Sequence, residues 1–396
     1  MRKKLLLKSV LSGCLAAASV SVAAAQGVET SKDGKAVAYT PASSTVSALG
    51  SMSRMSSADM DSAKSRLPML DDISQLPNVG MLNQSGSGFT NQAYGAFGGF
   101  PFTTRIVAQR PGSSRRTDPV DQKPYSQSGK LFMDFGTGGF FVCSASVIRP
   151  GLVLTAAHCV HEFGQGAGGF AQQVFFQPAR HNDDMPFGTW RAESIIVPGV
   201  YLNGTDRCLP GAEGIVCEND IAILVMESQV SEEGVEQEVG DLVGRYGLYQ
   251  NDQGYTAFGG DGDLAAHLTQ IGYPSAGYTG VRMIQNESIA VQDAPFALGP
   301  DTDYNQVIIG SNMTGGSSGG AWLHNFGKNE GYEGTPPVDD ARNRVASVTS
   351  WGFVNDSIKI QGGSRFGHNT TFPPGGPTNI RSLINFGCSF GAEKCN

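Results

Sequence analysis

The chain has 396 residues and a formal net charge of −8; 16% of its residues are charged and 53 are glycine. This length accommodates one domain plus processing segments. The acidic balance argues against a nucleic-acid partner, which favours a basic patch, and no apolar run after residue 30 is long enough to span a bilayer.

The first 25 residues are predicted to be a signal peptide. Basic residues at its start precede an apolar stretch over 9–22, and Ala23-Ala24-Ala25 forms a small-residue cleavage site. A lipoprotein signal at Cys14 is the alternative, although Lys8 shortens the apolar stretch before it. We therefore expect a secreted protein, either extracellular or periplasmic.

Residues 26–116 differ from the rest of the chain in composition. They are rich in Ser, Gly, Ala, Met and Asn, lack cysteine and show little sustained periodicity. We predict a largely loosely ordered pro-segment with one amphipathic helix within 44–72. Arg105-Ile106 and Arg115-Arg116 are candidate cleavage sites, and a permanent linker is the alternative.

The segment 117–396 is predicted to be an all-β catalytic domain. Short apolar runs alternate with Gly, Pro, Asn and Asp, and their spacing favours barrels over βαβ units. We expect a loop or a short helical turn over 232–242.

Three residues of this domain are predicted to form a catalytic triad. His158 ends an apolar run beside a cysteine, Asp220 begins another apolar run, and Ser318 lies between glycines. A serine becomes a nucleophile when an imidazole takes its proton and backbone N–H groups hold the oxyanion. We assign the oxyanion hole to the N–H groups of Gly316 and Ser318.

The order of these residues distinguishes between hydrolase classes. The 316–320 motif also satisfies the Gly-x-Ser-x-Gly pattern of α/β-hydrolases, but their histidine follows the serine. The order His, Asp, Ser is that of chymotrypsin-like β-barrels. Asp183, Asp184 and Asp206 are rival carboxylates, but none precedes a buried strand pattern as Asp220 does.

The cysteines are predicted to form disulfides. Seven cysteines minus Cys14 leave six, which allow 15 connectivities. Local pairing is the economical choice, and it gives the following bridges: Cys143–Cys159, Cys208–Cys217 and Cys388–Cys395. Zinc is the rival, but Cys-x-x-Cys is absent and the six histidines are scattered.

Two glycine-rich motifs have other interpretations. The segment 164–169 matches a dinucleotide pattern but opens no amphipathic helix, so we expect a surface loop. The segment 260–263 could lend oxygens to calcium, yet a solvated acidic turn is the simpler interpretation. We expect no cofactor and no metal.

Together the motifs resemble four landmarks of the trypsin/chymotrypsin family. These are Thr155-Ala156-Ala157-His158-Cys159, Asp220-Ile221-Ala222, Gly316-Ser317-Ser318-Gly319-Gly320 and Ser350-Trp351-Gly352. The serine motif and the segment 271–274 resemble a bacterial secreted branch related to glutamyl endopeptidases. The resemblance covers roughly 120–390.

The resemblance implies two six-stranded antiparallel β-barrels, one at about 125–235 and the other at about 240–390, with the triad in the cleft between them. It implies a serine endopeptidase acting on protein or peptide substrates, whose backbone would pair with Ser350, Trp351 and Gly352 as an added strand. The Cys143–Cys159 bridge matches the family bridge that braces the histidine. An esterase with the same triad and an inactive binding or adhesion relative remain alternatives, and we expect a monomer.

The resemblance also predicts the specificity pocket. Asn312 falls where trypsin-like relatives keep an aspartate, so Arg and Lys are disfavoured. Met313 and Thr349 replace the hydroxyl and the histidine that glutamate-specific relatives use, which weakens a preference for Glu. Gly352 leaves the mouth open, so we expect a neutral side chain.

Overall fold

The structure is a computed structural model of the 396-residue chain. It describes residues 27–41, 57–71, 94–97, 100–107, 120–249, 256–257, 264–276, 280–292, 306–327 and 342–396. The predicted signal peptide, Cys14, the Arg115-Arg116 site and the acidic turn 260–263 lie outside these residues. Within the described ranges, no helix is long and apolar enough to cross a membrane.

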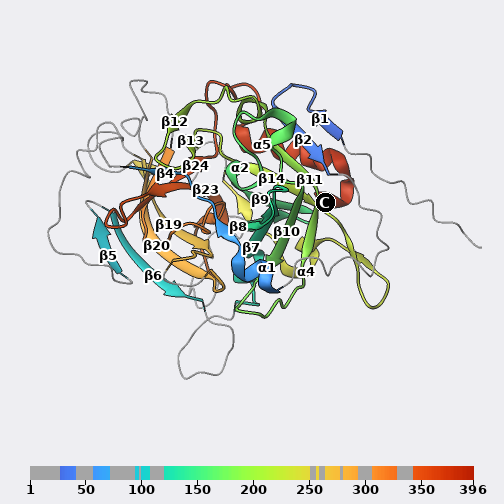
Figure 1. The fold of residues 1–396 in the computed structure, drawn as a ribbon, viewed down its shortest axis with the longest axis horizontal. Coiled ribbons are helices and arrows are strands. Elements are labelled where there is room, and N and C mark those ends of the chain that lie inside the picture. Colours follow the sequence, from blue (N-terminus) through green and yellow to red (C-terminus); the bar gives the residue numbers. More distant parts are fainter. Residues whose placement is uncertain are drawn as a thin grey trace, which may run out of the picture.

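The first barrel is built by six antiparallel strands from the first half of the domain (Figure 1). The strands are β7 (Ser128–Asp134), β8 (Phe140–Arg149), β9 (Leu152–Thr155), β10 (Gln173–Pro178), β11 (Trp190–Pro198) and β14 (Ala222–Met226). They pair in the order β7–β8–β9–β14–β11–β10, and β10 pairs again with β7. This ring has no free edge, so the sheet is closed.

The second barrel repeats this arrangement in the second half of the domain. Its strands are β19 (Leu264–Gly272), β20 (Ile284–Gln292), β21 (Gln306–Gly310), β22 (Ala321–His324), β23 (Arg344–Phe353) and β24 (Ile360–Arg365). They pair in the order β19–β22–β23–β24–β21–β20, and β20 returns to β19. The predicted two-barrel, six-stranded architecture is confirmed.

Apolar side chains that alternate along these strands fill each barrel. In the first barrel Val147, Phe176 and Leu224 are fully buried in one cluster. Another cluster joins the barrels, because it contains Ile223 of β14 together with Val348 of β23. The barrels are therefore packed together, and residues at their junction can come from either one.

Short elements connect and cover the barrels. α4 (Val239–Val243) is the predicted helical turn between them, and α5 (Asn379–Gly387) packs on β11 and β14. The segment 164–169 forms a turn before β10, outside any βαβ unit. The other short elements are β12 (Cys208–Pro210), β13 (Ile215–Cys217), β15 (Gln229–Val230), β16 (Glu236–Gln237), β17 (Gly247–Leu248), β18 (Thr256–Ala257), α2 (Ala157–Val160), α3 (Gly199–Leu202) and 3-10 turns at Tyr125–Gln127, Gly166–Gly169, Cys388–Phe390 and Ala392–Lys394.

Parts of the segment 26–116 are ordered against both barrels, where its composition predicted loose order. Its described elements are β1 (Gly27–Thr30), β2 (Ala36–Thr40), α1 (Ser57–Ser62), β3 (Lys64–Ser65), β4 (Met69–Leu70), β5 (Tyr94–Phe97) and β6 (Phe100–Ile106). β2 pairs with β11 of the first barrel and β6 with β20 of the second. β3 pairs with β8 and β4 with β23, so one stretch contacts both barrels.

Candidate active site

Two paired strands of the first barrel bring His158 and Asp220 together. His158 lies in α2 directly after β9, and Asp220 lies just before β14. The strands are antiparallel, so the end of β9 lies beside the start of β14. His158 Nδ1 is 2.7 Å from Asp220 Oδ2, and the His158 N–H donates to Oδ1 at 2.8 Å. This arrangement can orient an imidazole and stabilise its charged form.

The second barrel adds a partner to Asp220. Asp220 is fully buried, and a buried carboxylate needs hydrogen bonds to replace those of water. Ser350 Oγ on β23 donates to Asp220 Oδ2 at 2.6 Å, from a position 130 residues away in sequence. The sequence analysis assigned Ser350 to substrate pairing through its backbone and did not predict this use of its hydroxyl.

Ser318 lies in a glycine turn before β22. Gly316 has φ 96° and Gly319 has φ 74°, a backbone region that favours glycine. β8 anchors the turn: Ser144 N–H donates to the Ser318 carbonyl at 2.7 Å, and Ser144 Oγ donates to the Gly316 carbonyl at 2.8 Å. Within the described part of the chain, no acceptor takes a hydrogen bond from the N–H of Gly316 or Ser318.

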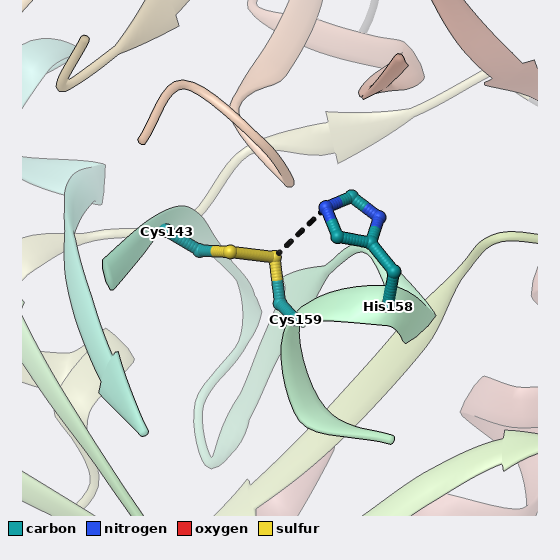
Figure 2. Close-up of side chains that lie close together, drawn as sticks. All are labelled: Cys143, His158 and Cys159. Atoms are coloured by element: carbon teal, nitrogen blue, oxygen red, sulfur yellow. Dashed lines mark hydrogen bonds between the residues drawn. A yellow bond between two sulfur atoms is a disulfide. The ribbon is translucent and has the colours of Figure 1, made fainter. Parts of the chain in front are cut away.

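The far side of the His158 ring faces a disulfide. His158 Nε2 lies 3.7 Å from Cys159 Sγ, and Cys159 is bonded to Cys143 (Figure 2). Among the hydrogen bonds between described residues, none joins His158 Nε2 to Ser318 Oγ. The Ser318 hydroxyl instead donates to the backbone carbonyl of Arg66.

A family model matches part of the sequence. Residues 120–240 match the family model described as Trypsin. This part of the chain is similar to the trypsin family. No curated protein matches the sequence.

Several solved protease structures are similar to this chain at low sequence identity. The protease Anisep from Arthrobacter nicotinovorans is 25% identical over 68% of this chain and 98% of its own, with a TM-score of 0.49. A thermostable serine protease, AL20, from an extremophilic microorganism is 26% identical over 61% of this chain and 92% of its own, with a TM-score of 0.45. A Glu endopeptidase is 16% identical over 69% of this chain and 96% of its own, with a TM-score of 0.43.

The structure pairs the six cysteines from Cys143 to Cys395 locally, as the sequence predicted. The bridges are Cys143–Cys159, Cys208–Cys217 and Cys388–Cys395. Among the described residues, donor atoms converge around His158 with the first bridge and around Asp206 with the second. The cysteines at both places are disulfide-bonded and hold no free thiolate for a metal.

The rival carboxylate Asp206 lies beside the candidate triad. It accepts from the Asn219 N–H at 2.8 Å and from Asn219 Nδ2 at 2.7 Å, and burial raises its pKa to about 6. Asn219 Oδ1 in turn accepts from Asn369 Nδ2 at 2.8 Å. Asp206 therefore holds the residue next to Asp220 rather than the imidazole.

The predicted pocket residues differ in their burial and in their hydrogen-bond partners. Asn312 Oδ1 accepts from Thr104 Oγ1 at 2.7 Å, and Met313 is buried. Thr349 is fully buried, and its hydroxyl accepts from Gln270 Nε2 at 2.9 Å and Trp322 Nε1 at 2.8 Å. The hydroxyl of Thr349 is thus occupied within the barrel, which the sequence alone did not indicate.

The other two pocket-side residues lie further along β23. Trp351 is fully buried, and its indole N–H donates to Gln306 Oε1 at 3.1 Å. The backbone N–H of Gly352 donates to the Pro68 carbonyl at 3.0 Å. Pro68, which precedes both barrels in sequence, therefore accepts a hydrogen bond from the backbone group that we assigned to the substrate.

Proposed function

We propose that the chain is a secreted serine endopeptidase made as a precursor. The observation that carries this proposal is the buried His158–Asp220 pair of the first barrel, whose Nδ1 and Oδ2 atoms are 2.7 Å apart. Ser144 of the same barrel also holds the turn of the second barrel that contains Ser318. Ser318 Oγ attacks the scissile carbonyl while His158 Nε2 takes its proton. Asp220 keeps the imidazole oriented and stabilises the imidazolium.

The later steps use the same groups. The N–H groups of Gly316 and Ser318 hold the oxyanion of the tetrahedral intermediate. His158 returns the proton to the leaving amine, and an acyl-enzyme remains on Ser318 until water hydrolyses it. These residues need no cofactor for this chemistry.

The substrate is a protein or peptide chain that pairs with the backbone of Ser350, Trp351 and Gly352. The neutral amide of Asn312 and the buried Met313 favour an uncharged residue before the cut. Cleavage-site profiling on a denatured proteome, with the Ser318→Ala protein as the blank, tests this. A strong preference for Arg, Lys or Glu would contradict the pocket assignment and leave the triad untouched.

Secretion and precursor status rest on separate observations. The three disulfides fit an oxidising compartment. The stretch from Lys64 to Leu70, within the segment we assign as the pro-segment, lies over Ser318. N-terminal sequencing of the secreted protein tests both the signal cleavage and the later processing site.

Two measurements separate the endopeptidase from its alternatives. Turnover of casein and of a short-chain nitrophenyl ester, with fluorophosphonate labelling of Ser318, is compared in wild type and Ser318→Ala. An endopeptidase cleaves casein and is labelled. An esterase is labelled and hydrolyses the nitrophenyl ester but does not cleave casein. An inactive binding relative is not labelled and cleaves neither substrate.

A further inference from the structure

Residues 64–70, which we call the strap, cross the candidate active site from one barrel to the other. Lys64 and Ser65 pair with β8 of the first barrel, and Met69 and Leu70 pair with β23 of the second. Both pairings are parallel. Arg66 lies between these two pairings in sequence, and its backbone carbonyl contacts Ser318.

The strap meets the nucleophile in a geometry that does not lead to cleavage. The Ser318 hydroxyl donates its proton to the Arg66 carbonyl oxygen, whereas catalysis requires that His158 take this proton. A productive carbonyl points its oxygen at the oxyanion N–H groups and offers its carbon to Oγ. The Arg66 carbonyl offers its oxygen to Oγ, so its bond to Leu67 is not positioned for attack.

The Arg66 side chain is held beside this carbonyl by three residues of the first barrel. Arg66 Nη2 donates to Glu162 Oε1 at 2.7 Å. The guanidinium carbon lies 4.4 Å from the ring centre of Phe135 and 5.2 Å from that of Phe141. A carboxylate with two aromatic rings is a good receptor for a guanidinium, since charge-assisted and cation–π contacts act together. We call Phe135, Phe141 and Glu162 the clamp.

Two residues of the clamp, Phe135 and Glu162, line a cavity. The cavity has a volume of about 770 Å³, and His158, Arg66 and Pro68 also line it. The Arg66 side chain is only 17% exposed there. The Arg66 side chain is therefore mostly buried, and it lines the same cavity as the candidate base His158.

The other half of the strap contacts the Ser318 turn and β23 of the second barrel. Leu67 lies against both Gly315 and Gly352, so close that a Cβ added at Gly352 would be 3.2 Å from Leu67 Cδ2. The Met69 N–H donates to the Glu213 carbonyl at 2.8 Å. A substrate cannot occupy these positions while the strap is present.

We propose that the clamp is a guanidinium-binding site, and that Arg66 bound in it holds the strap across Ser318 as an uncleaved internal inhibitor. The inhibitory role rests on the proposed peptidase function. The guanidinium-binding site does not depend on the peptidase function, because it is inferred only from the contacts between Arg66 and the clamp.

The first test measures how fast a fluorophosphonate labels Ser318 in the full chain. Arg66→Ala is expected to accelerate labelling roughly tenfold, equivalent to about 1.4 kcal/mol. Arg66→Glu and Glu162→Arg are each expected to accelerate it as well, and the double variant Arg66→Glu/Glu162→Arg to return it toward the wild-type rate. Lys64→Ala is the matched control, because it removes a cation from an exposed position of the same strap.

The second test follows the strap without using peptidase activity. In the Ser318→Ala chain, added trypsin is expected to cut after Arg66 roughly threefold faster when Glu162→Gln is also present, since the pair is partly exposed. Glu227→Gln is the control, because Arg191 and Glu227 form a similar ion pair at 2.8 Å elsewhere.

The outcomes distinguish the two proposals. Equal labelling of wild type and Arg66→Glu would overturn the inhibitor while leaving the peptidase intact. Equal trypsin cutting with and without Glu162→Gln would overturn the clamp. Absence of labelling in every folded variant would contradict the proposed function and with it the inhibitory role.

Discussion

The hydroxyl of Ser350 is a testable link between the barrels. Ser350→Ala removes the 2.6 Å hydrogen bond to the buried Asp220. A hydrogen bond to a charged group contributes about 1.5–3 kcal/mol, and about 1.4 kcal/mol corresponds to tenfold in rate. If most of this interaction supports the imidazolium in the transition state, labelling of Ser318 by a fluorophosphonate slows roughly 10- to 100-fold.

The assay compares Ser350→Ala with Ser347→Ala in the full chain, so that the strap is common to both. Ser347 lies on the same strand, is fully buried, and donates to the Ser364 carbonyl at 2.8 Å. Both variants lose a buried hydrogen bond, and thermal unfolding measures that loss. The reasoning is refuted if labelling slows equally in the two variants or stays at the wild-type rate in Ser350→Ala.

Three further predictions follow from the site. Ser318→Ala leaves a folded chain whose casein turnover falls by several orders of magnitude, because the nucleophile is lost. Asp206→Asn flattens the pH dependence of stability: burial raises the pKa of Asp206 from 3.8 to about 6, so its contribution is present below pH 3.8 and lost as pH rises through 6. Urea unfolding at pH 4 and pH 7 measures the free energy of unfolding of both proteins. Between pH 4 and pH 7 the wild type is expected to lose at most about 3 kcal/mol more stability than the variant. Proteins that begin at Ile106 and at Thr117 have similar activity, because Ser317 offers no carboxylate to a new N-terminus.

For each of these three predictions, one outcome would contradict the reasoning. Near wild-type peptide cleavage by Ser318→Ala would remove Ser318 from the mechanism. A stability difference between wild type and Asp206→Asn that is the same at both pH values would show that Asp206 does not titrate in this range. A large gain in activity that requires a free amine on Ile106 would show that the new terminus switches the pocket.

The sequence by itself determined the features that depend on local order along the chain. Apolar runs and glycine turns were sufficient to predict an all-β domain, and the order of His158, Asp220 and Ser318 favoured two barrels. The disulfides were predictable because each bridge closes a short loop, the longest spanning a sequence separation of 16. Short loops come together with little entropy loss.

Only the tertiary structure decided the contacts between distant strands. Ser350 reaches Asp220 and Ser144 holds the Ser318 turn because barrel closure sets the register of β23 and β8, and register is not encoded by any short motif. The same holds for the Thr349 hydroxyl, whose partners come from two other strands.

The segment 26–116 shows this division most clearly. Its small and polar residues predict loose order, yet β2, β6 and the strap are ordered where they pair with strands of the barrels. A short strand is unstable in isolation and gains its hydrogen bonds and burial from the sheet that it joins. The position of Arg66 in the clamp therefore depended on the folded barrels and could not be predicted from the composition of the segment.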